Sequence, residues 1–277
     1  MTKGRLSVCA TPIGNLGDVS DRLRDTLGEA DVVYAEDTRR TSKLLGHLGV
    51  RPRLRSLFIG NEKERSAELL ADVAQGLNVA LVSDAGMPTV SDPGAEAVRA
   101  VREAGFAVTV LPGPSAVTTA ITASGFGSDR FVFEGFLPRK GKTRSRRLAE
   151  ISKEERTVVV FASPHRLHDD LKDLQTELGG NRQVAVTREL TKLHEEVWIG
   201  SLSDAVEKWS GPAKGEITLV IDGTVPEAAS KEEAVDLALE LAQSGVTLSD
   251  AARQASKSTG VGRRVIYQAL LDNQEPT

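Results

Sequence analysis

Cysteine is almost absent from this sequence, since its 277 residues include one, Cys9. A single thiol excludes an internal disulfide and a cysteine-rich metal site, and it is typical of a protein from a reducing compartment. Long apolar runs are also missing: the longest covers residues 158–162, whereas a membrane helix needs about 20 apolar residues. The apolar stretch near the N-terminus is too short for a secretory leader. We therefore expect a cytoplasmic protein with no membrane segment.

The motifs of several common enzyme classes are missing as well. There is no G-x-x-x-x-G-K-[ST] phosphate loop, and no G-x-G-x-x-G follows the first predicted strand. A G-x-S-x-G nucleophile turn is absent, as is H-E-x-x-H. The histidines are not spaced as metal ligands: His47, His165, His168 and His194. These absences argue against P-loop nucleotide hydrolysis, ordinary dinucleotide binding, serine-hydrolase chemistry and a metal site.

Aromatic residues make up only 4% of the chain, so the core must consist mainly of Val, Leu, Ile and Ala. Charged residues account for 27% and hydrophobic residues for 40%, as in an ordinary globular protein. The net charge of −4 argues against broad electrostatic adhesion to nucleic acid. A polyanion would therefore have to bind a local basic patch.

One such patch is the segment PRKGKTRSRR at 138–147, which contains six basic residues and no acidic residue. A solvated helix face usually mixes both signs of charge, so a run of one sign favours phosphate contact. The alternative is an unpaired surface loop. The predicted phosphate-contacting residues are Arg139, Lys140, Lys142, Arg144, Arg146 and Arg147.

Short strand-like runs alternate with amphipathic helical segments over residues 1–222. The first half has runs at 5–10, 31–36, 54–58, 78–83 and 107–112, and the second at 131–136, 157–163, 183–188, 195–200 and 216–222. Strands separated by helices predict a mostly parallel sheet covered on both faces. The last strands of the second half have antiparallel character, so there we expect a mixed sheet. The fold class is α/β.

We predict three domains: an α/β domain over 1–126, a second α/β domain over 127–223, and a helical tail over 224–277. The tail begins with Ser230 and Glu233 at capping-box spacing. It continues as two helices separated by Thr259–Gly262, which predicts a helix-turn-helix-like unit. A packing appendage, a dimer contact and a nucleic-acid contact all remain open for this tail.

Four Gly-, Pro- or Asp-rich loops follow predicted strands of the first half, at 11–18, 36–43, 83–94 and 112–116. In an open α/β sheet, ligands bind at the carboxyl ends of the strands, where such loops gather. Any one of these loops could be a simple tight turn. Four at one sheet edge favour a ligand site.

Seven segments carry a resemblance to a known family: TPIGNLGD, AEDTRRT, SDAGMPTVSDPG, PGPSA, FEGFLPRK, ASPHRL and RELTKLHEE, in this order. Together they resemble the tetrapyrrole-methylase (class III) superfamily of S-adenosylmethionine-dependent methyltransferases. AEDTRRT, FLPRK and RELTK are similar to the branch that acts on RNA and not on tetrapyrrole rings. The resemblance implies 2′-O-methylation of a cytidine ribose in small-subunit (16S) ribosomal RNA, and a homodimer.

The resemblance also implies that S-adenosylmethionine binds in the cleft between the two α/β domains. Its donor-binding residues would be Pro12, Ile13, Gly14, Asp84, Ala85, Gly86, Met87, Ser115, Ala116, Phe161, Ala162, Leu190, Glu216 and Ile217. The ligand's hydroxyls, ammonium and sulfonium call for backbone groups, a few acids and apolar walls, which these loops contain. Asp92, which precedes Pro93 and Gly94, is interpreted here as a turn-capping residue, with a ligand contact as the alternative.

A ribose hydroxyl is a weak nucleophile, so a base or a nearby cation would assist its methylation. Our hypothesis gives Asp37 or Glu189 the role of base, and Lys192 or Arg39 that of stabilising the alkoxide or holding phosphate. The alternative is that these four residues form ion pairs on the rim of the cleft.

Two other functions fit parts of the sequence. A small-molecule methyltransferase of the tetrapyrrole type would have a closed apolar cleft and no use for the basic segment. A non-catalytic ribosome-binding factor would have degenerate donor loops, whereas those of this chain are intact.

Overall fold

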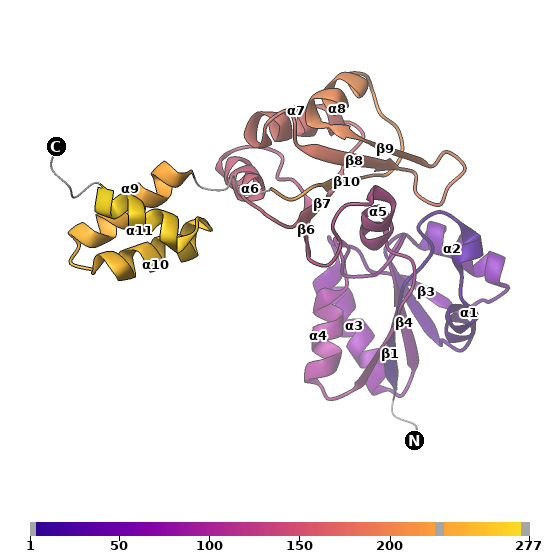
Figure 1. The fold of residues 1–277 in the computed structure, drawn as a ribbon. Helices are drawn as coiled ribbons and strands as arrows, with labels where there is room; N and C mark the ends of the chain where they lie inside the picture. Colours follow the sequence, from indigo (N-terminus) through magenta and orange to yellow (C-terminus); the bar gives the residue numbers. More distant parts are fainter. Residues whose placement is uncertain (1–3, 225–229, 273–277) are drawn as a thin grey trace. The chain divides into compact units, whose positions relative to one another are not determined.

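We describe the fold from a computed structural model, which places residues 4–224 and 230–272. The chain divides into two compact units, residues 1–223 and 224–277. In the part of the chain that is described, no helix is both long and apolar enough to cross a membrane. The larger unit contains two five-stranded sheets and the smaller is helical, which confirms the predicted fold class (Figure 1).

The first sheet is parallel throughout, in the order β3-β2-β4-β1-β5. Its strands are β1 (Arg5–Cys9), β2 (Val32–Ala35), β3 (Arg53–Ser56), β4 (Asn78–Val82) and β5 (Ala107–Leu111). Helices α1 (Asp21–Gly28), α2 (Thr38–Leu48), α3 (Glu62–Ala74) and α4 (Ala95–Glu103) connect them. Alternate strand residues point to opposite faces of the sheet, and each face has its own hydrophobic core. Leu6 and Val8 pack with α3 and α4, whereas Cys9 packs with α1 and α2.

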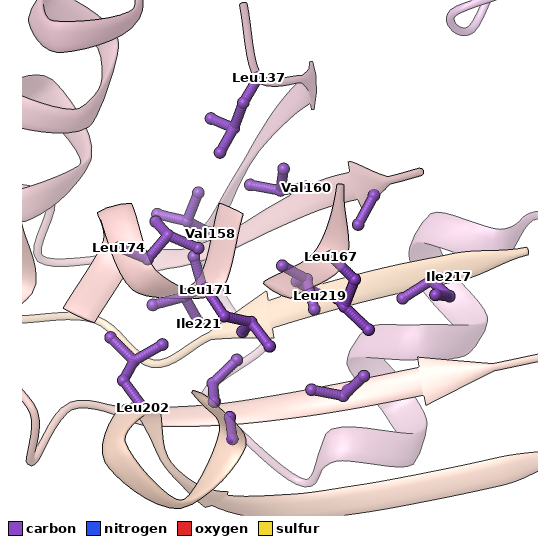
Figure 2. Packing of buried hydrophobic residues seen from close by; sticks show 14 of the residues in the cluster. Leu137, Val158, Val160, Leu167, Leu171, Leu174, Leu202, Ile217, Leu219 and Ile221 are labelled. Atoms are coloured by element: carbon purple, nitrogen blue, oxygen red, sulfur yellow. The ribbon is translucent and has the colours of Figure 1, made fainter. Parts of the chain in front are cut away.

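The second sheet is mixed, in the order β6-β7-β10-β8-β9, with only β6 and β7 parallel. Its strands are β6 (Phe131–Phe136), β7 (Thr157–Ala162), β8 (Gln183–Arg188), β9 (Glu196–Ser201) and β10 (Ile217–Ile221). Helices α6 (Lys142–Ser152), α7 (Leu167–Leu178) and α8 (Leu202–Lys208) cover one face. Figure 2 shows the aliphatic packing beneath them, where Leu171, Leu219 and Leu202 are fully buried. The prediction of a mixed sheet is confirmed.

Helix α5 (Ala116–Ser124) covers the opposite face of the second sheet, although it directly follows the last strand of the first. Val117 and Ile121 pack there with Val159 and Val220. Ile13, from the loop after β1, belongs to the same core. The predicted division at residue 126 therefore differs from the packing, because α5 lies on the second sheet and joins the two halves into one unit.

The helical unit consists of α9 (Lys231–Gln243), α10 (Leu248–Thr259) and α11 (Arg263–Asp272). Its core contains five fully buried alanines, among them Ala238 and Ala251, and two fully buried larger aliphatics, Ile266 and Leu270. The predicted capping box is present, since Ser230 accepts from the Glu233 backbone and Glu233 accepts from that of Ser230. Helix α10 ends at Gly260, whose φ of 75° is left-handed, so the predicted break is confirmed.

Candidate functional site

A cavity of about 440 Å³ lies between the loop edges of the two sheets. This volume is within the range of small-molecule sites. The cavity is lined by Ile13, Glu36, Arg40, Asp84, Ala85, Gly86, Met87, Val90, Ser91, Asp92, Ser115, Ala116, Val117, Phe136, Phe161, Ala162, Ser163, Pro164, Thr187, Leu190, Gly215, Glu216, Ile217 and Thr218. Both sheets therefore contribute to one site.

The parallel pairing of the first sheet brings its loops together here, because all its strands end at the same edge. Thr11, after β1, exchanges two backbone hydrogen bonds with Gly86, after β4, at 2.9 and 3.0 Å. Gly86 has a φ of 78°, which a residue with a Cβ adopts at a cost. These bonds fix the first and third predicted loops as one wall of the cavity.

Three carboxyl groups gather in this wall: Glu36 after β2, Asp84 after β4, and Asp92. Burial, reinforced by the charge of Asp84, raises the pKa of Glu36. Burial also raises the pKa of Asp92 to about 6, with a further contribution from the charge of Glu36. These carboxylates lack enough positive charge around them, so the wall would favour a cationic ligand.

Among the residues that the structure describes, Arg40 is the one cation that lines the cavity, and its Nε lies 3.6 Å from Asp84 Oδ2. The Arg40 side chain is largely exposed, so its pairing with Asp84 is screened by solvent. Asp84 is held in place on its other side, because its Oδ1 accepts a hydrogen bond from the Asp37 backbone N–H at 2.9 Å. Asp84 is therefore the anchored member of the acidic group.

The second sheet supplies an apolar wall. It includes Phe161 at the end of β7, Ile217 at the start of β10, and Leu190 in the loop after β8. Phe161 makes an edge contact with Phe133, at a ring-centroid distance of 4.9 Å. A planar or aliphatic part of a ligand could pack against this wall while its charge faces the carboxyl groups.

Strained backbone flanks the cavity on both sides. Among the described residues, positive φ outside glycine occurs at Thr89 and Ser91 on one side and at Glu189 and Thr191 on the other. The surrounding structure must stabilise such conformations, which cost about 1–3 kcal/mol each and concentrate at functional sites. This distribution supports the cavity as the site.

All the predicted donor-binding residues except Pro12 and Gly14 line the cavity. Gly14 instead lies against the loop after β8, where an added Cβ would be 2.3 Å from Lys192 Cγ. The neighbouring Asn15 backbone N–H donates to Thr191 Oγ1 at 3.1 Å. The first loop therefore spans the cleft and contacts the opposite lobe, and Ile13 is the member of its three predicted donor-binding residues that lines the cavity.

The four residues of the base-and-cation hypothesis do not line the cavity. Asp37 caps α2, and its carboxylate accepts from Arg39 Nε at 3.1 Å and Nη2 at 2.7 Å. This pairing lowers the pKa of Asp37, which weakens it as a base. The arrangement corresponds to the alternative of an ion pair on the rim.

Glu189 and Lys192 are likewise paired with each other. Glu189 Oε1 accepts from Lys192 Nζ at 2.8 Å and from the Glu216 backbone N–H at 2.9 Å. These bonds lower the pKa of Glu189. Lys192 also lies 3.1 Å from the Glu216 carboxylate, which does line the cavity. The pair braces the strained loop at the rim of the cavity.

Some basic residues of the segment 138–147 form ion pairs with carboxylates and others do not. Arg139, Lys140 and Lys142 are exposed, and no carboxylate of the described residues is within salt-bridge distance of them. Arg146 is exposed and lies 3.7 Å from Glu150. Arg147 is partly buried and paired with Glu134 and Glu150. Only part of the predicted phosphate-binding set is therefore free.

The prediction that Arg144 contacts phosphate is wrong, because its side chain is buried within the second lobe. It is 7% exposed and donates to Asp173 at 2.7 Å, to Asp170 at 2.8 Å and to the Pro138 carbonyl at 2.9 Å. Its charge is already neutralised by two carboxylates. Arg144 fixes the segment before α6 onto α7 and is a structural residue.

Four residues that stand out in the cavity were not among the predicted site residues: Glu36, Arg40, Asp92 and Phe136. Glu36 and Arg40 are sequence neighbours of Asp37 and Arg39, which were predicted to be site residues. Which of residues 36–40 face the cavity depends on the geometry at the start of α2, and this cannot be read from the sequence. Asp92 follows Ser91, whose φ of 65° redirects the chain. No motif gave a signal for Phe136.

Among the described residues, no group of three His, Cys, Asp or Glu is arranged to hold a metal ion.

Residues 5–206 match the family model described as tetrapyrrole (corrin/porphyrin) methylases. The chain is 45% identical over 273 residues to ribosomal RNA small subunit methyltransferase I of Synechocystis, with 97% of this chain and 98% of the relative covered. It is also 45% identical to the protein of the same name in Mycobacterium tuberculosis, covering 100% of this chain and 98% of the relative. Among solved structures, the methyltransferase CobJ matches with a TM-score of 0.64 at 20% identity, over 82% of this chain and 97% of that one.

Proposed function

This chain belongs to the tetrapyrrole (corrin/porphyrin) methylase family, and on that premise we propose that it methylates small-subunit ribosomal RNA, using S-adenosylmethionine. The acceptor is the ribose 2′-oxygen of a cytidine. The observation that carries the proposal is the cavity between the sheets, in which an acidic wall faces an apolar wall. The full-length 45% identity to curated relatives named for this reaction supports the choice of RNA as substrate.

The cavity fits the donor by its chemistry as well as by its volume. S-adenosylmethionine supplies a methyl group on a positively charged sulfur. Burial raises the pKa of Glu36 and of Asp92, with a further contribution from the charge of Asp84 to Glu36 and of Glu36 to Asp92, and a cation beside them would favour their charged forms. Phe161, Leu190 and Ile217 offer apolar contact to the rest of the molecule. The residues present therefore match a cationic, partly aromatic ligand.

We assign proton acceptance to Asp92, with Glu36 beside it. As the new O–CH₃ bond forms and the sulfur–methyl bond breaks, the 2′-hydroxyl must release its proton. Asp92 lines the cavity, and its pKa of about 6 is close to neutral, as a general base requires. Asp37 and Glu189 have lowered pKa values and lie outside the cavity. Arg39 and Lys192 remain candidates for phosphate contact at the rim.

The free basic residues after β6 would position the RNA backbone. We expect the triple substitution Arg139→Ala, Lys140→Ala and Lys142→Ala to weaken RNA binding and to reduce the slope of log affinity against log salt. The slope changes by about 0.7 for each lost phosphate contact with single-stranded RNA, or about 2 in total. Binding isotherms over a range of salt concentrations measure it.

A matched control replaces three exposed basic residues of α3 and α4: Lys63→Ala, Arg99→Ala and Arg102→Ala. It removes the same charge from a surface that lacks the cavity. If the two triple variants change the salt slope equally, the segment after β6 has no special role.

The proposed reaction is tested with tritiated S-adenosylmethionine and three acceptors: small ribosomal subunits, free small-subunit RNA and a porphyrinoid. We expect label in RNA, and nuclease digestion should recover it on a 2′-O-methylated cytidine. Label in the porphyrinoid alone would establish the alternative of a small-molecule methyltransferase. Transfer to no acceptor, despite donor binding, would favour a non-catalytic ribosome-binding factor.

Two further features are part of the proposal. The edge strands β5 and β9 expose Val110, Val197 and Ile199, which supports association with a second copy of the chain. Because the proposed substrate is ribosomal RNA, the protein would act in the cytoplasm.

A further inference from the structure

Strand β6 contains an irregularity that changes the direction of one aromatic side chain. In the pairing with β7, Phe133 lies opposite Val159 and Phe136 lies opposite Phe161. Three steps along β6 therefore match two along β7, which defines a bulge. Gly135, within the bulge, has a φ of 63°, in the left-handed region that favours glycine.

The bulge places Phe136 on the same face of the sheet as Phe133 and Phe161. Without the extra residue, the alternation of a regular strand would put positions 133 and 136 on opposite faces. The Phe136 ring lies 5.5 Å from the Phe161 ring, at an interplanar angle of 59°. The next residue, Leu137, returns to the opposite face and is buried beneath α6 and α7. The aromatic ring is thereby directed to the cavity side.

Phe136 lines the cavity and is nevertheless 59% exposed. It therefore lies where the cavity opens to solvent, with Phe161 on one side of its ring and free space on another. Exposure of a large aromatic ring forgoes about 1.5–3 kcal/mol of burial free energy. The hydrophobic core on the same face of the sheet includes Phe133 and Phe161 but not Phe136.

The neighbours of Phe136 indicate what it could bind. Arg139 and Lys140 follow within four residues and are exposed. An aromatic surface beside free positive charge is the arrangement by which proteins bind single-stranded nucleic acid, with the base stacked and the phosphate paired. The acidic wall of the same cavity suits the cationic donor instead.

We propose that Phe136 is the stacking platform for the base of the target nucleotide, which enters the cavity mouth unpaired. This inference rests on the proposed function and specifies the form of its substrate: a cytidine in a single-stranded segment, or one displaced from its helix. Stacking of the base would hold its ribose at the mouth of the donor cavity, next to Asp92. The basic residues after β6 would hold the flanking phosphates.

The test measures the binding of a short single-stranded cytidine oligonucleotide by fluorescence anisotropy, and donor binding by calorimetry. Stacking on one aromatic side chain contributes about 1–3 kcal/mol, so Phe136→Leu should weaken RNA binding by about 5- to 150-fold. Leucine retains the apolar packing against Phe161 but has no flat face. Phe136→Trp should restore binding, and the affinity for S-adenosylmethionine should not change.

Phe131→Leu is the matched control, since Phe131 is an exposed phenylalanine on the same strand that does not line the cavity. Equal RNA affinity of the Phe131 and Phe136 variants would overturn the inference. A loss of donor affinity in Phe136→Leu with RNA affinity retained would also overturn it, and would assign the ring to the donor's adenine. If the wild type binds RNA through Phe136 but methylates no ribosomal RNA, the proposed function fails and the stacking role stands.

Discussion

Replacing Arg144 with alanine is expected to lower the free energy of unfolding by about 3–5 kcal/mol, the usual cost of removing one partner from a buried ion pair. The reason is the state of the residues left behind. Asp170 is 5% exposed and would lose its shorter ion pair, keeping only Arg166 at 3.3 Å, and the Pro138 carbonyl would lose its donor. Urea unfolding of the purified variant measures the effect.

The control is Arg146→Ala, two positions along the same helix, whose side chain is largely exposed and 3.7 Å from Glu150. We expect it to change the unfolding free energy by less than about 1 kcal/mol. Comparing the two variants distinguishes a basic residue that stabilises the fold from one that is free to bind RNA in the same segment. An Arg144→Ala variant of wild-type stability that binds RNA poorly would show that this residue does contact the substrate.

Replacing Asp92 with asparagine is expected to reduce kcat by about 100-fold or more, the usual contribution of a general base. In the wild type, kcat/KM should fall as the pH decreases through about 6, because the carboxylate must be unprotonated to accept the 2′-hydroxyl proton. The variant should lose this pH dependence together with the rate. Single-turnover methyl transfer over a pH series measures both.

Asp37→Asn is the comparison, because it tests the base that sequence reasoning chose. Asparagine can still cap α2, so the helix start is preserved. We expect a smaller loss of kcat than for Asp92→Asn. A larger loss for Asp37→Asn, or an unchanged pH profile for Asp92→Asn, would contradict the assignment.

The same carboxyl group gives a prediction for stability. The pKa of Asp92 is raised in the folded state, so its contribution to stability is fully present below its unfolded pKa and is lost as the pH rises through about 6. Asp92→Asn should therefore raise the melting temperature at about pH 7.5 and give little change at about pH 4. Differential scanning calorimetry at the two pH values provides the measurement.

Much of the fold could be predicted from the sequence, because it depends on local patterns. Valine-containing apolar runs such as 79–82 and 158–160 alternate with amphipathic helices, and this alternation leads directly to the two sheets. The loop positions follow from it, since parallel strands end at one edge. That is why most of the predicted donor-binding residues line the cavity. The position of α5 could not be predicted, because it packs against strands of the second sheet that are distant in the sequence.

The individual roles in the site were harder to predict, because they depend on contacts between distant segments. The charge of Arg144 is neutralised by Asp170 and Asp173, which lie 26 and 29 residues farther along the chain. Arg146, two positions farther along the basic segment, is the same residue type but remains exposed. The carboxyl groups of Glu36 and Asp92 come together only through the order of strands β2 and β4.

The aromatic platform was missed for a similar reason. A regular strand over 131–136 places Phe136 on the face opposite Phe133, and only the bulge at Gly135 reverses this. A glycine inside a strand pattern is the signal that could have indicated a bulge. Only the pairing of β6 with β7 shows that this bulge turns the Phe136 ring toward the cavity.

The central claim is that the methyl donor binds between the two sheets, with its charge toward the acidic wall. A crystal structure with S-adenosylhomocysteine, the demethylated product, tests it most directly. The account predicts the ligand within the cavity, in contact with Gly86, Leu190 and Ile217, and with its sulfur on the side of Asp92. Density for the ligand at any other place on the protein would contradict it.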